Sequence, residues 1–244
     1  MGALLHIVVV LLGLLLGVVC PPPPQPFHPI LFNGEINDNL FEGDIILPLD
    51  FPKGRSARSA FTRDPMNKWD IDVEVSWTFG SHYAAPMAAQ IRSAFDFWAS
   101  NLCINFWENG TTLPLIVVSN VEGCSSAVGR QYRQETQPIS LLDGACNLRG
   151  TILHEIAHTL GLDHTQSRWD RDQYVKYHPE NVQEKRAGNF EKMEQSANNN
   201  FGVGYDYGSV MHYGAGSMSK TPDFPVLEPI DPLFINSMGQ RERA

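Results

Sequence analysis

The run HEIAHTLGLDH at residues 154–164 decides how the rest of the chain is interpreted. On an α-helix, His154 and His158 lie one above the other, because residues four apart share a face. Both imidazoles can therefore reach one metal ion, while Glu155 projects from the neighbouring face toward a water on that metal. The run thus predicts a helix that presents two metal ligands and a base.

The end of the run predicts a third ligand from beyond the helix. His164 follows His158 by six residues, so it cannot stay on the same helical face. Gly161 allows the chain to turn back, because glycine accepts positive φ at a helix C-terminus. Three nitrogen ligands with one open position are typical of catalytic zinc, whereas structural zinc usually has four protein ligands.

Chance is the alternative explanation for the first part of the run. A bare H-E-x-x-H also occurs in unrelated helices, where the histidines are ordinary surface or capped polar residues. Because Gly161 and His164 add two further matching positions, we prefer the zinc interpretation.

Composition and charge fit a globular protein with one catalytic domain and additional segments. The 244 residues are 43% hydrophobic and 18% charged, which is enough for an independent core. The formal net charge is −9, and lysine and arginine gather on no periodic face. Nucleic-acid binding is therefore disfavoured.

The N-terminus predicts entry into the secretory pathway. Residues 3–19 form an apolar run broken only by His6, and prolines at 21–24 end any helix there. The run is short for a membrane span, so we interpret residues 1–20 as a signal peptide, with an N-terminal anchor as the alternative. We expect a secreted protein, without stable membrane association unless the leader is retained. In such a protein the sequon at Asn109 would be glycosylated.

Residues 21–58 are rich in proline and have no helical period, so they predict no core of their own. Within the run FEGDI at 41–45, Asp44 follows a glycine and could approach a metal closely. An ordinary polar turn explains the same pentapeptide. An R-x-x-R pattern at 55–58 is of the kind that processing proteases cut, although residues 53–63 also fit an exposed linker. A carboxylate offered from a removable segment would displace the catalytic water until cleavage.

Periodicity predicts the elements of the N-terminal half. Apolar and polar side chains alternate over residues 71–79, which predicts a half-buried strand. Pro86 can open a helix at its first turn, and apolar side chains then form one stripe. The runs 113–118 and 139–142 predict two further strands. The stripe consists of Met87, Ile91, Phe95, Trp98 and Leu102.

The four cysteines predict one disulfide. Cys20 ends the leader, whereas Cys124 and Cys146 flank the strand predicted at 139–142. A bridge between these two would close a loop of about 23 residues and contribute roughly 3 kcal/mol in the chain-entropy model. Cys103 is then left without a partner, which is unusual in a secreted protein.

Two motifs follow the zinc run. The dense charges at residues 168–172 favour, from spacing alone, a solvated surface turn. In the run SVMHYG at 209–214, Tyr213 could ligate a metal at rest and then donate a hydrogen bond to a developing oxyanion. His212 points elsewhere than Tyr213, so we do not expect it to be a ligand.

Together these motifs resemble the astacin family of zinc endopeptidases, a branch of the metzincins, over roughly residues 40–240. The resemblance rests on the zinc run with RGTI at 149–152, RxDRDxY at 168–174, NV at 181–182, SxMHY at 209–213 and FEGD at 41–44. It implies an α+β fold of two lobes with zinc in the cleft between them. The N-terminal lobe would hold a twisted mixed β-sheet and two long helices, and the C-terminal lobe would be rich in loops. An edge strand near residues 124–128 would hold the substrate extended.

The resemblance also implies roles for single residues. Glu155 would be the general base, Tyr213 a mobile fifth ligand, and Met211 part of a turn beneath the metal. Asp44 would occupy the water position in the zymogen, so that the protein's own propeptide is its inhibitor. One zinc ion per chain would be held by His154, His158 and His164.

The implied reaction is hydrolysis of peptide bonds in protein or peptide substrates, without a covalent intermediate. Zinc would lower the pKa of its water toward roughly 7, and Glu155 would take the proton as the carbonyl is attacked. Zinc and Tyr213 would stabilise the oxyanion, and Glu155 would return the proton to the leaving amine.

Two departures from the family pattern bear on this expectation. Thr165 stands where astacins have a glutamate near the mature N-terminus, which we expect at Ser59. The family closes with a helix whose cysteine would pair with Cys103, and this chain stops at 239–244, where that segment would begin. We therefore expect residues 59–244 to be a peptidase domain that lacks its C-terminal end.

Two other interpretations stay open. One is a non-catalytic, zinc-binding secreted homologue, inactive because the C-terminal segment is missing. The other is a different metzincin that matches FEGD and SVMHY only by accident.

Overall fold

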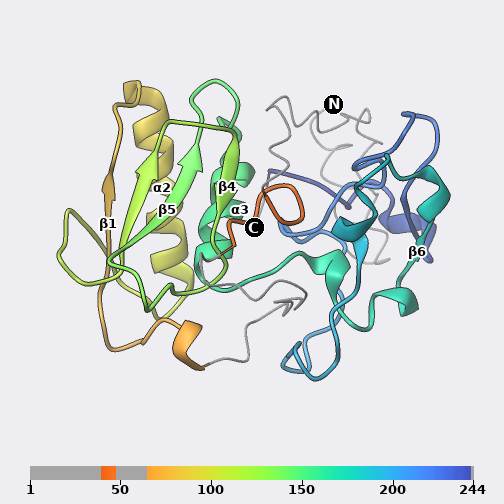
Figure 1. Cartoon of the computed structure of the whole chain (residues 1–244), viewed down its shortest axis with the longest axis horizontal. Coiled ribbons are helices and arrows are strands. Elements are labelled where there is room, and N and C mark those ends of the chain that lie inside the picture. Colours follow the sequence, from red (N-terminus) through yellow and green to blue (C-terminus); the bar gives the residue numbers. More distant parts are fainter. Residues whose placement is uncertain (1–39, 48–64, 243–244) are drawn as a thin grey trace, which may run out of the picture.

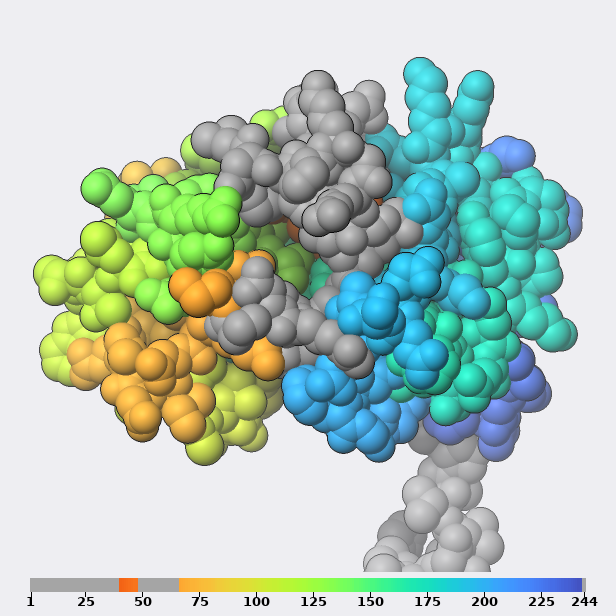
Figure 2. Space-filling model, turned by 60° about the horizontal axis from the view of Figure 1, so that its bottom comes forward, coloured from red at the N-terminus to blue at the C-terminus, as the bar shows by residue number. Residues whose placement is uncertain are grey.

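The structure is a computed structural model, and it describes residues 40–47 and 65–242. The leader at 1–20, the R-x-x-R pattern at 55–58 and the expected new N-terminus at Ser59 lie outside the described residues. Two halves stand on opposite sides of the molecule, one built on a sheet and one rich in loops (Figures 1 and 2). This arrangement is the predicted α+β fold of two lobes.

A mixed five-stranded sheet forms the N-terminal lobe, in the order β2-β1-β3-β5-β4. The neighbours pair in parallel, except that β4 runs antiparallel to β5. As the last strand in the order, β4 lies at one edge of the sheet. The strands are β1 (Val75–Phe79), β2 (Phe106–Glu108), β3 (Leu115–Ser119), β4 (Cys124–Ser126) and β5 (Thr136–Leu141).

Two helices, α2 (Ala85–Asn101) and α3 (Arg149–Thr159), lie on one face of this sheet (Figure 1). The predicted stripe explains why α2 lies there: Met87, Ile91 and Phe95 of the stripe are at most 2% exposed. One of them, Phe95, stacks on Trp77 of β1 with ring centroids 4.2 Å apart. The shared core is completed by apolar side chains of β3, β5 and α3, namely Ile116, Val118, Ile139, Leu141, Ile152, Leu153 and Ile156.

The predicted strand at 71–79 is wrong in its first half. Ile71 and Val73 are 63% and 44% exposed, and β1 begins only at Val75. The Asp70 carboxylate accepts the backbone N–H of Asp72 at 3.1 Å, and this local bond holds a turn. The stripe of α2 is likewise wrong at its end, because the helix stops at Asn101 and leaves the next side chain exposed.

The C-terminal lobe is rich in loops, as predicted. Its strands β6 (Val175–Tyr177) and β7 (Leu227–Pro229) pair antiparallel over a second core of apolar and aromatic side chains. The other elements of this lobe are short 3-10 helices: η2 (Thr165–Ser167), η3 (Arg171–Gln173), η4 (Pro179–Asn181), η5 (Ala187–Phe190) and η6 (Pro232–Phe234). One more 3-10 helix, η1 (Pro65–Asn67), precedes β1.

The charge cluster at 168–172 is not a solvated turn, and that prediction is wrong. Arg168 and Asp170 are buried and form a bidentate pair, with N–O distances of 3.0 and 2.8 Å. Arg171 is also buried and donates to the backbone carbonyls of Gln166 and Phe190. Because the guanidinium groups reach loop carbonyls, this cluster holds the loops of the C-terminal lobe together.

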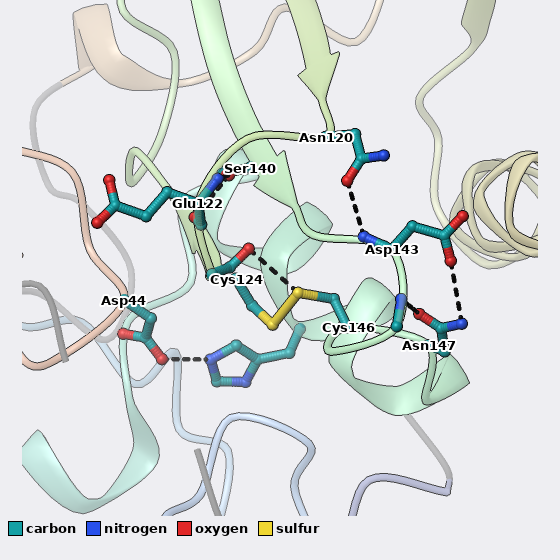
Figure 3. Close-up of a disulfide and its surroundings, with 11 residues drawn as sticks. Asp44, Asn120, Glu122, Cys124, Ser140, Asp143, Cys146 and Asn147 are labelled. Carbon is teal, nitrogen blue, oxygen red and sulfur yellow. Dashed lines mark hydrogen bonds and ion pairs between the residues drawn. A yellow bond between two sulfur atoms is a disulfide. The ribbon is translucent and has the colours of Figure 1, made fainter. Parts of the chain in front are cut away.

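The predicted disulfide joins Cys124 of β4 to Cys146, with Cα atoms 5.9 Å apart (Figure 3). It ties the edge strand to the segment that leads into α3. Cys103 is free and exposed, and the sequon residue Asn109 is exposed too. No helix within residues 40–47 and 65–242 is long and apolar enough to cross a membrane.

Gly150, in the first turn of α3, touches the backbone of the C-terminal segment. A Cβ at Gly150 would lie 2.0 Å from the carbonyl oxygen and 2.5 Å from the Cα of Arg241. We expect Gly150→Ala to lower the free energy of unfolding by at least about 1 kcal/mol, because this clash outweighs the helical preference of alanine. Urea unfolding of the full chain measures the change.

Gly188→Ala is the matched control for this prediction. A Cβ at Gly188, which lies in η5, meets no heavy atom within 4 Å. The urea midpoint of the Gly188→Ala chain should stay close to that of the unchanged chain. Equal midpoints for the two variants would contradict the close approach at Gly150.

Candidate metal centre

Three histidines converge at the boundary between the lobes. His154 and His158 lie one turn apart on α3. Beyond the helix, Gly161 has φ +104°, so the chain turns as predicted and brings His164 back. The three ring centroids lie 4.5 to 5.3 Å apart, and each histidine is at most 2% exposed.

The carboxylate of Asp44 lies among the three imidazoles. Its Oδ2 is 3.2 Å from Nε2 of both His154 and His164, and its Oδ1 is 3.8 Å from Nε2 of His158. Figure 3 shows Asp44 directed at an imidazole nitrogen. The four residues form the one group within residues 40–47 and 65–242 that is arranged to hold a metal ion.

Each histidine is oriented through its other nitrogen. Nδ1 of His154 bonds the carbonyl of Val210 at 2.8 Å, and Nδ1 of His158 bonds that of Leu162 at 2.8 Å. Nδ1 of His164 bonds Oε2 of Glu42 at 2.7 Å. A proton held at Nδ1 leaves the Nε2 lone pair for a metal, which is the usual arrangement around metal-binding histidines.

Distances and unpartnered atoms fit a tetrahedral zinc ion. Neighbouring ligand atoms are about 3.3 Å apart in a tetrahedron whose metal–ligand bonds are about 2.0 Å. The two shortest contacts of Asp44, at 3.2 Å, match that spacing. Asp44 Oδ1 and His158 Nε2 are buried without a hydrogen-bond partner, as expected for atoms that turn toward a metal.

The protonation of the histidines also suits a metal. Burial, followed by the charge of Arg241, lowers the pKa of His154 to about 4. Burial and the neighbouring histidines lower the pKa of His158 well below its usual value, so both rings are neutral at neutral pH. Burial alone would lower the pKa of His164, but the carboxylates of Asp44 and Glu42 outweigh it and raise that pKa to about 10. Metal binding must therefore displace a proton from His164.

The pKa values of the two carboxylates at the centre, Asp44 and Glu155, are shifted in opposite directions. Burial would raise the pKa of Asp44, but the charge of His164 and hydrogen bonds from two histidines hold it well below its usual value. Burial, and then the charge of Asp44, raise the pKa of Glu155 well above its usual value. Oε2 of Glu155 is buried without a hydrogen-bond partner, next to the predicted ligands on α3. Such a carboxylate is ready to accept a proton.

Asp44 reaches the centre because its backbone lies along the edge strand β4. Ser126 N donates to the Asp44 carbonyl and Ile46 N donates to the Ser126 carbonyl, both at 2.9 Å. Ile45 forms a parallel bridge with Ser126, so residues 44–46 lie along the outer side of β4 (Figure 1). We call residues 40–47 the blocking segment. It covers the strand predicted to hold an extended substrate.

Glu42 is a site residue that sequence reasoning missed. It is 2% exposed and has φ +52°, a left-handed backbone that is uncommon for glutamate. Its carboxylate accepts from Nδ1 of His164 and, at 3.2 Å, from Oγ of Ser167. Its backbone carbonyl accepts the phenol O–H of Tyr213. Only the acidic side chain next to Gly43 in FEGD hinted at this role.

The turn at 209–214 lies against the three histidines. Met211 is buried and packs near Ala157 of α3, and its carbonyl accepts the N–H of Thr165 at 3.0 Å. Tyr213 is buried with its ring centroid 4.6 Å from that of His164. Burial, and then the charges of two carboxylates, raise the pKa of Tyr213 well above its usual value, so the phenol stays protonated.

His212 lies apart from the metal group, as expected. Its Nε2 bonds the phenol of Tyr205 at 2.7 Å, and its Nδ1 bonds the carbonyl of Tyr213 at 2.6 Å. With both ring nitrogens engaged, His212 supports the turn. Thr165 is buried beside the third histidine, and the carboxylate at Nδ1 of that histidine comes from Glu42.

Comparison with known proteins defines the class of this fold and site. The chain is similar to a solved structure described as high choriolytic enzyme 1, a hatching enzyme zinc-protease from Oryzias latipes. The TM-score is 0.63 with 31% identity, over 78% of this chain and 90% of that one. The fold is therefore that of a zinc protease, and three imidazole ligands suit zinc.

The family itself follows from the sequence matches. A family model described as Astacin, a family of peptidases, matches residues 61–244. The chain is 33% identical over 228 residues to zinc metalloproteinase dpy-31 of Teladorsagia circumcincta, covering 87% of this chain and 36% of that protein. It is 34% identical over 220 residues to zinc metalloproteinase nas-28 of Caenorhabditis elegans, covering 86% and 44%. The chain belongs to the astacin family, and it spans less than half the length of these two relatives.

Proposed function

We propose that this protein is a secreted, zinc-dependent endopeptidase that is made as a zymogen. One observation carries the proposal: the Nε2 atoms of three buried histidines converge on the carboxylate of Asp44, while their Nδ1 atoms are held by other groups. The family relationship supports the same activity, since both curated relatives are named zinc metalloproteinases.

In this proposal His154, His158 and His164 hold the metal. Zinc at that position supplies Lewis acidity, which lowers the pKa of water toward roughly 7 and polarises the scissile carbonyl. Glu155 takes the proton of the attacking water through its free carboxylate oxygen and later delivers it to the leaving amine.

Tyr213 acts after the blocking segment has left. Its protonated phenol then loses the carbonyl of Glu42 as a partner and can donate a hydrogen bond to the developing oxyanion or approach the metal. Met211, packed against α3, supports the turn that carries this phenol.

Latency comes from the blocking segment. Asp44 fills the position that the attacking water needs, and Glu42 engages both His164 and Tyr213. We propose residues 1–20 as the signal peptide, 21–58 as the propeptide and 59–244 as the peptidase domain. Cleavage after Arg58 would release the block. The exposed Asn109 would carry an N-linked glycan.

The substrates in this proposal are proteins or peptides that bind extended along β4. The blocking segment already uses the backbone groups of Ser126 for pairing, so a substrate strand can use them after its removal. Side-chain preference would come from groups that line the primed and unprimed sides of this edge.

Removal of zinc tests the proposal. We expect the full chain, once cut after Arg58, to digest a denatured protein, and a chelator to reduce the rate by at least about 100-fold. Adding zinc back should restore the rate. The uncut chain is the control and should show no cleavage. Proteolysis that survives complete metal removal would contradict the proposal. Zinc binding without any cleavage would favour a non-catalytic homologue.

A further inference from the structure

Arg241 is a buried cation that the proposed mechanism does not use. It is 8% exposed, and its Nη1 donates to the backbone carbonyls of His212 at 3.3 Å and Gln240 at 3.0 Å. Among residues 40–47 and 65–242 no carboxylate forms an ion pair with it. A buried guanidinium without a contacting anion is costly, so nearby charges must offset its burial.

The backbone around Arg241 runs between two parts of the metal centre. We call residues 238–242 the strap. Its Gly239 has φ +75° and lies so near Gly214 that a Cβ would come within 2.4 Å of the Gly214 Cα. The carbonyl of Arg241 accepts the N–H of Gly150 at 2.8 Å, at the start of α3.

A side chain of the strap also holds the other end of the tyrosine-bearing turn. The amide of Gln240 donates to the carbonyl of Gly208 at 2.6 Å, and the guanidinium of Arg241 reaches the carbonyl of His212. The strap therefore connects the turn that carries Tyr213 to the helix that carries His154 and Glu155.

The charges at the centre explain how the cation is tolerated. Burial lowers the pKa of Arg241, and the negative charges of Asp44 and Glu155 act in the opposite direction. The charge of Arg241 in turn acts on Glu155 and on Tyr213.

We infer that Arg241 is a positioning residue of the metal centre, which holds the backbone between His212 and Tyr213 against the start of α3. The inference rests on the proposed function for its catalytic consequence. The position of the turn, and hence of the phenol, can be measured without catalysis.

Two substitutions in the full, processed protein test this role. Arg241→Met removes the charge and the donors at similar volume, and Arg241→Lys keeps the charge and one donor group. We expect Arg241→Met to bind one zinc, to keep KM within about twofold and to lose at least about tenfold in kcat, because misplaced groups act mainly on the chemical step. Arg241→Lys should recover part of the loss.

Cobalt(II) in place of zinc supplies a readout that does not need turnover. The visible absorption of the bound ion reports the geometry of its ligands, and we expect Arg241→Met to change that spectrum. Arg149→Met is the matched control, because Arg149 is exposed on the same first turn of α3 and stacks over Phe97. It should leave both kcat and the spectrum unchanged.

The outcomes distinguish the positioning role of Arg241 from the proposed peptidase function. Unchanged kcat and an unchanged cobalt spectrum in Arg241→Met overturn the positioning role. A loss of rate that disappears when kcat is expressed per folded, metal-loaded molecule overturns it as well, because the residue is then merely structural. If Arg241→Met does not fold, kcat and the cobalt spectrum of Arg241→Lys test the positioning role instead. A protein without activity whose spectrum still changes refutes the proposed function but supports the positioning role.

Discussion

Replacing Glu155 by glutamine is expected to abolish peptide-bond cleavage by the processed protein while zinc stays bound. Glutamine has nearly the same shape but cannot accept the proton of the attacking water, and a positioned general base contributes about 10²- to 10⁴-fold. Metal binding should persist because Glu155 is not among the residues arranged to hold a metal, and the three histidines of that group remain in the processed protein. The measurements are kcat/KM on a denatured protein and the zinc content of the purified variant.

Folding provides a further check on this variant. Burial raises the pKa of Glu155 well above its usual value, so the ionised side chain is costly to bury and a neutral amide should not weaken the fold. Glu122→Gln is a suitable control, since Glu122 is exposed just before β4. A Glu155→Gln protein with full zinc and the unchanged rate would refute the assigned base.

Replacing Asp44 by alanine is expected to make the uncut chain active. The Asp44 carboxylate is buried among three imidazoles, and breaking such a buried ionic contact costs about 3–5 kcal/mol. Each 1.4 kcal/mol is about tenfold in an equilibrium constant. The open fraction, and with it the activity of the uncut chain, should therefore rise by at least about 100-fold. Activity is measured with Arg58 replaced, so that no processing contributes.

Glu42→Gln separates the two acidic side chains of the blocking segment. It keeps Asp44 at the centre and retains the backbone carbonyl that accepts from Tyr213, so its uncut chain should gain much less activity. If the uncut Asp44→Ala chain is as silent as the unchanged chain, Asp44 does not block the site. If Glu42→Gln matches Asp44→Ala, the block depends on the whole segment rather than on one carboxylate.

The metal site was predictable because most of its geometry is local. The 3.6-residue period places His154 and His158 together, and the left-handed conformation of Gly161 accounts for the return of His164. The same holds for α2, whose stripe of apolar residues faces the sheet, and for the disulfide between Cys124 and Cys146. The strand prediction was wrong at Ile71 and Val73. Alternation of apolar and polar residues does not reveal the hydrogen bond to the Asp70 side chain, which holds these residues in a turn before the strand.

Charged residues were the main source of error. The spacing of the charges predicted a solvated turn at 168–172. Arg168 and Arg171 are instead buried, and they donate to the carbonyls of Gly204 and Phe190, which lie 36 and 19 residues further along the chain. A buried charge is stable only with partners, and the sequence does not show which partners a loop will bring. Arg241 was overlooked for the same reason, since its neighbours His212 and Gly150 lie far from it along the chain.

By itself, the sequence predicted the three-histidine group, because helical period and glycine conformation act over a few residues. Its motifs predicted the astacin fold through their resemblance to that family, which the family match bears out. Only the tertiary structure decided which residues outside the zinc run and the FEGD aspartate contact and support the site. Glu42 and His164 are 122 residues apart, and the contacts of Arg241 join the end of the described chain to α3 and the tyrosine-bearing turn. Such contacts depend on how the lobes pack, and no local periodicity records them.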